Sequence, residues 1–302
     1  MVDLECPRRR WSARILGIWL GFFVSTSLAD PAAVTPRWLV SFSAAANGKT
    51  AESTAVPVEG DSTLVVVVAV GADPVEPKLQ LGNRLVPAKV IGFDPVSRLQ
   101  FIQVQGGMPT KAPDWLSDSG DNSNASYTAM APGGPVKCRS TDWVKQVGGK
   151  ILPLGLLRVT FGGSVPPPGT PLMDDAGRVA AIVFQDAGGG NVGYAIPAEA
   201  VRRVRHDICN GGHLVRGWLG LSLRAESQSP QVVRVLPNSP ASAAGVLPGD
   251  ILVSIGSRQV TGYADAANAF FYLIPGQPVK VKLLRGVDQL EYSLTPTKPA
   301  SK

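Results

Sequence analysis

The sequence predicts a mainly β protein that ends in a small α+β domain. The chain has 302 residues, which is enough for two hydrophobic cores, and 44% of its residues are hydrophobic. It contains 33 glycines and 26 prolines, which are typical of many short strands joined by turns. After residue 215 the pattern changes, because short strands begin to alternate with two short helical segments.

The first 29 residues have the features of a secretory signal peptide. Arginines at positions 8–10 and 14 precede an apolar stretch at residues 15–24, and the small residues Ser27 and Ala29 mark a cleavage site. This stretch is shorter than the roughly 20 apolar residues of a membrane span. We therefore expect export to the periplasm or cell envelope, with an uncleaved membrane anchor as the alternative.

The chain after this segment is expected to consist of strands. Residues 63–70 (TLVVVVAV) form a continuous apolar run that suits a strand buried on both faces. Gly82-Asn83 is a hairpin signal between residues 78–81 and 84–90. Residues 106–124 are polar and rich in turn formers, so we expect them to connect two subdomains. Further strands are expected at residues 127–131, 143–147, 156–161, 178–184 and 191–196.

A helix is expected at residues 197–209, where Pro197 occupies the start and Gly211-Gly212 follows the end. Its apolar stripe consists of Ala200, Val201, Val204 and Ile208. The last part of the chain is expected to contain strands at residues 231–236 and 251–255, a short helix capped by Ser239, a helix at residues 264–273, and a hairpin of residues 279–284 and 289–294.

Three segments of this last part resemble the core of bacterial PDZ domains. They are residues 236–241 (LPNSPA), 244–246 (AGV) and 249–252 (GDIL), and the similarity extends from about residue 216 to residue 296. The resemblance implies that the domain binds the free C-terminal peptides of other proteins. In that mode the peptide adds as a strand to a sheet edge, and backbone N–H groups bind its carboxylate.

The resemblance also implies which residues bind the peptide. Residues 218–221 (WLGL) match the carboxylate-binding loop, and the peptide is expected to pair with the strand that follows. Arg216 adds positive charge near the carboxylate, and the helix at residues 264–273 supplies a pocket wall. The expected peptide-binding residues are Arg216, Trp218, Leu219, Gly220, Leu221, Leu223, Ala267 and Phe271. The alternative is that Trp218, Leu219 and Phe271 are ordinary core residues.

The strand-rich part, residues 38–209, resembles the HtrA/Deg family of exported serine proteases. Residues 88–95 (AKVIGFDP) are similar to the strand and turn before the catalytic aspartate of that family. Gly169 and Pro171-Leu172 are similar to the end of its nucleophile motif, GNSGGPL, and residues 193–197 (GYAIP) to its GFAIP segment. The resemblance implies a trypsin-like double β-barrel followed by a PDZ domain, and a tendency to assemble with other family members.

The catalytic residues of that family have no counterparts in this chain. A serine triad needs a hydroxyl nucleophile, an imidazole and an orienting carboxylate. In the family register the aspartate position holds Arg98 and the serine position holds Pro168. The two histidines, His206 and His213, both follow the last expected barrel strand, and the expected histidine region, residues 64–69, is entirely apolar. We therefore predict a pseudoprotease with no catalytic residues.

Two alternatives remain open at this stage. A serine endopeptidase with a divergent or relocated site would have to use other groups. Those available are the hydroxyls of Ser140, Ser164 and Thr170 and the amines of Lys137 and Lys150. A purely structural envelope protein would instead fill its own peptide-binding site with the tail at residues 295–302. The absence of histidine from the barrel argues against the enzyme, and the carboxylate-loop sequence argues for binding.

The remaining composition limits the partners and cofactors. After removal of the signal peptide, Cys138 and Cys209 remain, either as a disulfide or as two separate thiols. No CxxC spacing or cofactor motif is present, so we assign no metal and no cofactor. The formal charge is +6, but no basic run is interleaved with aromatic residues, so a nucleic-acid partner is not expected. The expected partners are C-terminal peptides of exported proteins and, in homo- or hetero-oligomers, HtrA-like relatives.

The expected organisation follows from these segments. It comprises a signal peptide at residues 1–29, a degenerate trypsin-like double β-barrel at 30–209, a linker at 210–215, a PDZ domain at 216–297 and a tail at 298–302. The expected function is peptide binding that scaffolds or modulates protein quality control in the envelope.

Overall fold

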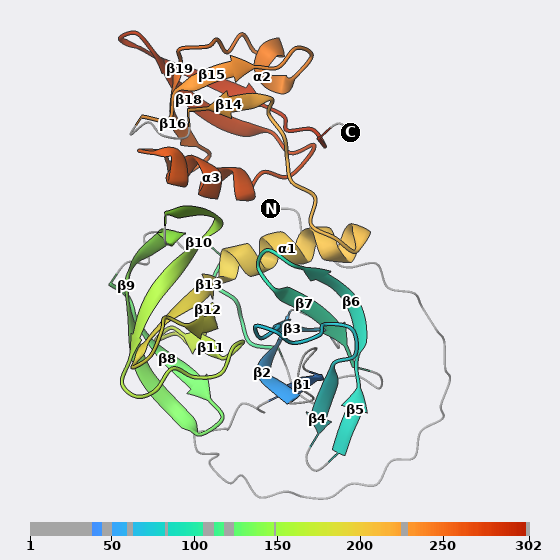
Figure 1. The fold of residues 1–302 in the computed structure, drawn as a ribbon. Coiled ribbons are helices and arrows are strands. Elements are labelled where there is room, and N and C mark those ends of the chain that lie inside the picture. The colour runs from blue at the N-terminus through green and yellow to red at the C-terminus, as the bar shows by residue number, and fades with distance from the viewer. Residues whose placement is uncertain are drawn as a thin grey trace, which may run out of the picture.

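The computed structural model describes residues 38–43, 50–58, 63–81, 84–104, 112–117, 124–147, 149–224 and 229–299. Two β-rich halves lie side by side, helix α1 (Ala198–Gly211) runs across both, and the α+β domain lies beyond that helix (Figure 1). The architecture is mainly β, as the sequence predicts. The proposed signal peptide at residues 1–29 falls outside the described residues.

The first half is a seven-stranded antiparallel sheet with the strand order β5-β4-β1-β2-β3-β7-β6. The strands are β1 (Trp38–Ser43), β2 (Thr50–Pro57), β3 (Thr63–Val67), β4 (Lys78–Leu81), β5 (Arg84–Pro87), β6 (Lys89–Asp94) and β7 (Leu99–Gln103). All five residues of β3 are buried, as expected for the start of this apolar run, but the strand ends at Val67 and Val70 is 79% exposed. The strand expected at residues 84–90 is two strands, β5 and β6, because Pro87 ends the pairing with β4.

The second half is a closed barrel with the strand order β10-β13-β12-β11-β8-β9. Its strands are β8 (Ser126–Ala131), β9 (Gly134–Val147), β10 (Lys150–Phe161), β11 (Pro171–Met173), β12 (Val179–Asp186) and β13 (Val192–Pro197). The hairpin of β9 and β10 is much longer than the two segments expected at residues 143–147 and 156–161. A register shift between Ile151 and Leu156 interrupts the apolar periodicity of β10, which hid the full length of the strand.

Helix α1 closes the core between the two halves. Its buried stripe contains all four expected residues, Ala200, Val201, Val204 and Ile208. These pack in one cluster with residues of both halves, such as Phe101 from β7 and Ile182 from β12. The helix ends at Gly212, whose left-handed backbone (φ 74°) lets its N–H bond to the carbonyl of Ile208.

The C-terminal domain contains a two-stranded sheet and a four-stranded sheet with the order β17-β16-β18-β19. Its elements are β14 (Leu221–Leu223), β15 (Val232–Val235), α2 (Pro240–Ala243), β16 (Ile251–Ile255), β17 (Arg258–Gln259), α3 (Tyr263–Phe271), β18 (Val279–Arg285) and β19 (Asp288–Leu294). Ser239 caps α2 by accepting a hydrogen bond from the N–H of Ser242, as expected. The buried Asp250 carboxylate binds the Arg285 guanidinium through both oxygens, at 2.7 and 2.8 Å, which holds the pKa of Asp250 below its usual range.

Helix α3 also joins this domain to the barrel (Figure 1). The Gly155 N–H of β10 donates to Asn268 Oδ1 at 2.8 Å, and the Lys145 amine of β9 lies 2.6 Å from Asp265 Oδ1. Burial raises the pKa of Asp265, but hydrogen bonds from Lys145 and Thr261 outweigh it and lower the pKa overall. Arg258 forms an ion pair with Glu199 of α1 and lies over the Tyr272 ring. The helix therefore packs against two domains at once.

The candidate disulfide is not formed. Cys138 and Cys209 are both thiols. Cys138 is buried in the core of the closed barrel, and Cys209 lies in the last turns of α1. Burial raises the pKa of the Cys138 thiol to about 11, so it stays protonated.

Within the described ranges, none of the helices has the length and apolar character that crossing a bilayer requires. The same ranges contain no group of side chains suited to holding a metal ion.

Candidate peptide-binding site

Strand β14 has an unpaired edge within the part of the chain that the structure describes, because its only sheet partner is β15. The Leu236 N–H donates to the Gly220 carbonyl, so Ser222 and Arg234 form the hydrogen-bonded pair of this ladder. The backbone groups of Leu221, which alternate with those of Ser222, therefore point to the open edge. An extended peptide can pair with this edge as an added strand.

The loop before β14 has three successive N–H groups available. Earlier in the loop, Gly217 N–H donates to the Leu273 carbonyl at 3.1 Å, and Trp218 exchanges two hydrogen bonds with Thr297. By contrast, no described residue accepts a hydrogen bond from the N–H of Leu219, Gly220 or Leu221. Adjacent backbone donors of this kind suit a carboxylate, which accepts several hydrogen bonds.

Gly220 is required by the loop geometry for two reasons. Its φ is +80°, a left-handed conformation that other residues adopt only at a cost. In addition, a Cβ atom at this position would lie 2.1 Å from Cβ of Ser239, the capping residue of α2. In the segment that matches the carboxylate-binding loop, Gly220 thus lies at a position where any larger residue would collide with Ser239.

The side chains of this segment divide between core and surface. Leu219 is 3% exposed and belongs to the core of the domain, as the alternative reading of the sequence had it. Leu221 and Leu223 are partly buried and pack against the same core. Trp218 is partly buried, and Arg216 is exposed just before the loop. The side chains next to the open edge are therefore mainly apolar.

The structure corrects one wall residue on α3. Phe271 is 2% exposed and packs into the apolar cluster of the barrel and α1, so it faces away from β14. Phe270, which the sequence pattern did not indicate, packs against the same core as Leu221 and Leu223. Ala267, three residues before Phe270 and hence on the same side of α3, remains partly exposed. Ala266, Ala269 and Leu273 lie in that same core, but α3 carries apolar residues on both faces, so the sequence pattern did not indicate which face packs there.

The tail pairs beside the loop. Thr297 forms an antiparallel bridge with Trp218, and the carbonyl of Pro296 accepts from the Gly276 N–H. This part of the tail therefore forms hydrogen bonds with both backbone groups of Trp218 and does not pair with the edge of β14. Residues 300–302, which complete the expected tail, lie outside the described residues.

The segments aligned with the histidine and aspartate positions of the HtrA/Deg family contact each other in the first half of the fold. Val68, in the expected histidine region, donates its N–H to the carbonyl of Arg98 at 2.9 Å. The Arg98 guanidinium crosses to β12, where it lies over the Phe184 ring and donates to the Phe184 carbonyl at 3.1 Å. Burial lowers the pKa of Arg98 to about 10, which leaves it charged at neutral pH.

The nucleophile position is held by backbone contacts. Pro168 accepts a hydrogen bond from the Thr54 N–H at 2.8 Å, and Gly169 donates to the Val183 carbonyl at 2.7 Å. Residues 166–168 are three consecutive prolines, so this stretch has no backbone N–H to bind an oxyanion.

Three of the five groups available to a relocated site have structural partners. Thr170 Oγ1 donates to the Pro167 carbonyl, and Ser140 Oγ bonds to both backbone groups of Ala125. Lys137 donates to Thr128 on the surface, while Ser164 and Lys150 are both exposed. His206 lies on α1 with Nδ1 3.0 Å from Asp207 Oδ1, and the exposed His213 contacts the Gly211 carbonyl.

Known proteins are similar to this chain in its PDZ domain and in most of its length. The PDZ domain family matches residues 217–295. The chain is 27% identical over 233 residues to a probable periplasmic serine endoprotease, DegP-like, of Chlamydia trachomatis, covering 70% of this chain and 46% of that protein. It is 27% identical over 245 residues to the periplasmic pH-dependent serine endoprotease DegQ of Escherichia coli, covering 72% and 52%. The chain thus spans about half the length of these curated relatives.

Solved structures share the fold. The HtrA-type protease AlgW with a tripeptide superimposes with a TM-score of 0.61 at 20% identity, over 89% of this chain and 96% of that one. The serine endoprotease from Yersinia pestis gives a TM-score of 0.52 at 18% identity, over 87% and 93%. Together, the PDZ match, the sequence relatives and the two-part β architecture show a trypsin-like fold with a C-terminal PDZ domain, similar to that of the HtrA/Deg-like proteases.

Proposed function

We propose that this protein is an exported, non-catalytic HtrA-like protein whose PDZ domain binds free C-termini of partner proteins. The observation that carries the proposal is the set of unengaged N–H groups at Leu219, Gly220 and Leu221 beside the open edge of β14. The periplasmic location in the names of the relatives supports export. Binding of this kind would scaffold or modulate protein quality control in the envelope, alone or in oligomers with HtrA-like relatives.

The chemistry of the site defines the peptide class. The terminal carboxylate accepts hydrogen bonds from the loop, and the preceding residues pair with β14. The last side chain of the peptide then lies near the apolar residues Leu221, Leu223 and Phe270, with the small Ala267 leaving space. Arg216 adds a positive charge on the surface. We therefore propose peptides with a free carboxylate and a hydrophobic last residue.

Fluorescence polarisation with labelled peptides tests this function. A peptide ending in a free-acid leucine or valine is expected to bind at least about tenfold more tightly than its C-terminal amide, because the amide lacks the charge that the N–H groups favour. Peptides ending in aspartate serve as the side-chain control. Equal affinity for the acid and the amide, or no binding of either, contradicts carboxylate binding.

The proposal that the barrel is non-catalytic rests on what occupies the triad positions. Arg98 places a cation where a carboxylate would orient an imidazole, and Pro168 has neither a hydroxyl nor an N–H. The barrel sequence also contains no histidine, since His206 and His213 lie in α1 and after it. Substitution at all three positions removes the nucleophile, its base and the group that orients the base.

The alternative function is a serine endopeptidase with a divergent or relocated site, which the names of the curated relatives favour. A fluorophosphonate probe distinguishes the two, because it labels only serines that are activated as nucleophiles. We expect no labelling of the intact chain under conditions in which an active HtrA relative is labelled, and no digestion of casein. Labelling that disappears in Ser164→Ala, the exposed hydroxyl next to the three prolines, supports the enzyme instead.

A further inference from the structure

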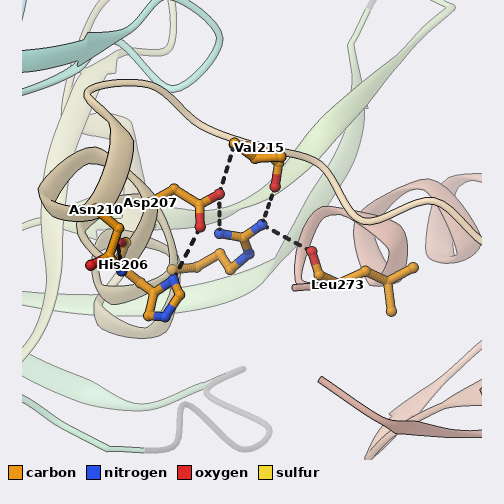
Figure 2. Close-up of polar contacts among 6 residues, drawn as sticks. His206, Asp207, Asn210, Val215 and Leu273 are labelled. Carbon is orange, nitrogen blue, oxygen red and sulfur yellow. Dashed lines mark hydrogen bonds and ion pairs between the residues drawn. The ribbon is translucent and has the colours of Figure 1, made fainter. Parts of the chain in front are cut away.

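A buried ion pair on α1 connects the barrel to the peptide-binding loop. Arg203 Nη1 lies 2.7 Å from Asp207 Oδ2, and these side chains are only 3% and 6% exposed. Burial of such a pair is costly unless other hydrogen bonds satisfy its remaining groups. Here Asp207 Oδ2 and Arg203 Nη2 bond to the chain that leads into the PDZ domain and to Leu273, while Arg203 Nε has no hydrogen-bond partner among the described residues (Figure 2).

The pair holds both backbone groups of Val215. Asp207 Oδ2 accepts a hydrogen bond from the Val215 N–H at 2.7 Å, and Arg203 Nη2 donates to the Val215 carbonyl at 2.8 Å. Val215 immediately precedes Arg216, where the peptide-binding segment begins. Two side chains of the barrel helix thus fix the backbone at the entrance to the loop.

The same guanidinium reaches the end of α3. Arg203 Nη2 also donates to the Leu273 carbonyl at 2.9 Å. That carbonyl accepts a second hydrogen bond, from the N–H of Gly217 in the loop, at 3.1 Å. One carbonyl group therefore joins the barrel helix, the helix that flanks the binding edge and the start of the carboxylate-binding loop.

We infer that Arg203 is a positioning residue for the peptide-binding loop, so that docking of the barrel sets the affinity of the PDZ domain for C-terminal peptides. This inference rests on the proposed function. Fixing Val215, Gly217 and Trp218 leaves the N–H groups of Leu219, Gly220 and Leu221 held in place before a ligand arrives. A site ordered in advance loses less conformational entropy on binding, and its affinity is correspondingly higher.

The test removes the pair while keeping the domain folded. Loss of one partner alone would leave an uncompensated buried charge, whereas apolar replacement of both is often neutral for stability. We therefore choose the double variant R203M/D207L in the full chain. Its matched control is R158M/D142L, which removes an ion pair of 3.4 Å from the surface of the barrel. Arg203→Lys, which keeps the charge but lacks the planar fork, is the milder second variant.

Two measurements decide the outcome. R203M/D207L is expected to bind the free-acid peptide about tenfold more weakly, which corresponds to about 1.4 kcal/mol of binding free energy. It should also lose much of the discrimination between acid and amide, because the N–H groups of the loop are no longer held in place before binding. Hydrogen–deuterium exchange of the peptide-free protein is expected to speed up at residues 217–221 but not in β16. Arg203→Lys should change both in the same direction by a smaller factor, and the control should change neither.

The inference is overturned if R203M/D207L and Arg203→Lys fold, and both bind peptide and exchange like the wild type. If R203M/D207L unfolds, the measurements on Arg203→Lys decide alone. Failure of the proposed function has a different signature, since the wild type would then bind no free-acid peptide. In that case faster exchange at residues 217–221 still supports the positioning role, and unchanged exchange rejects it.

Discussion

Gly169→Ala is expected to destabilise the barrel by about 3–5 kcal/mol, which is the range of severe backbone and packing defects. Gly169 has φ +82°, and a Cβ atom there would lie 1.9 Å from the Thr54 carbonyl oxygen of β2. This contact is with backbone in the middle of a sheet, so no side-chain rotation relieves it. The change should appear as a lower midpoint in urea unfolding followed by tryptophan fluorescence.

Gly177→Ala is the matched control. Gly177 has a similar φ of +76°, but nothing lies within 4 Å of the Cβ position. Its cost should therefore be about 1 kcal/mol, the backbone strain alone. Equal midpoints for the two variants would contradict the close packing of the loop that contains Gly169 on β2.

Gly220→Ala is expected to weaken peptide binding by about 100-fold or more. The added methyl group meets Cβ and Oγ of Ser239 at 2.1 and 2.4 Å, so either the loop or the start of α2 must move. Movement of the loop displaces the N–H groups that bind the carboxylate, and the left-handed backbone adds strain. Fluorescence polarisation with the free-acid peptide measures the effect.

Gly286→Ala, at the turn between β18 and β19, provides the comparison in the same domain. Gly286 also has positive φ (63°), and nothing lies within 4 Å of its Cβ position. This variant should bind peptide with an affinity within about twofold of the wild type, since it disturbs neither β14 nor the loop. Unchanged binding by Gly220→Ala would show that the carboxylate does not bind at this loop.

The elements that the sequence predicted well are those with a strong local pattern. The apolar run of β3, the stripe on α1 and the Ser239 cap all depend on residues close together in the chain, and the structure has each of them. The unengaged N–H groups of Leu219, Gly220 and Leu221 likewise fall on the matched loop, because that loop is a continuous segment.

The features that sequence reasoning missed depend on long-range packing. Both faces of α3 carry apolar residues, so local pattern alone did not show that Phe271 packs on the barrel and Phe270 on the PDZ core. The contact between Arg203 and Leu273 joins residues 70 positions apart. Arg203 is a charged residue on the buried side of α1, and nothing in the neighbouring sequence indicates that it bonds to Leu273. The register shift in β10 similarly interrupted the alternation that would have marked the whole strand.

The double packing of α3 has a consequence for engineering. Asp265, Asn268 and Phe271 contact residues of the barrel or its core. Ala266 and Ala269 pack in the PDZ core. Few positions on the helix are then free to change without loss of stability. Selection of variants with altered peptide preference should therefore concentrate substitutions in β14, at Leu221 and Leu223, whose partly buried side chains pack against the PDZ core.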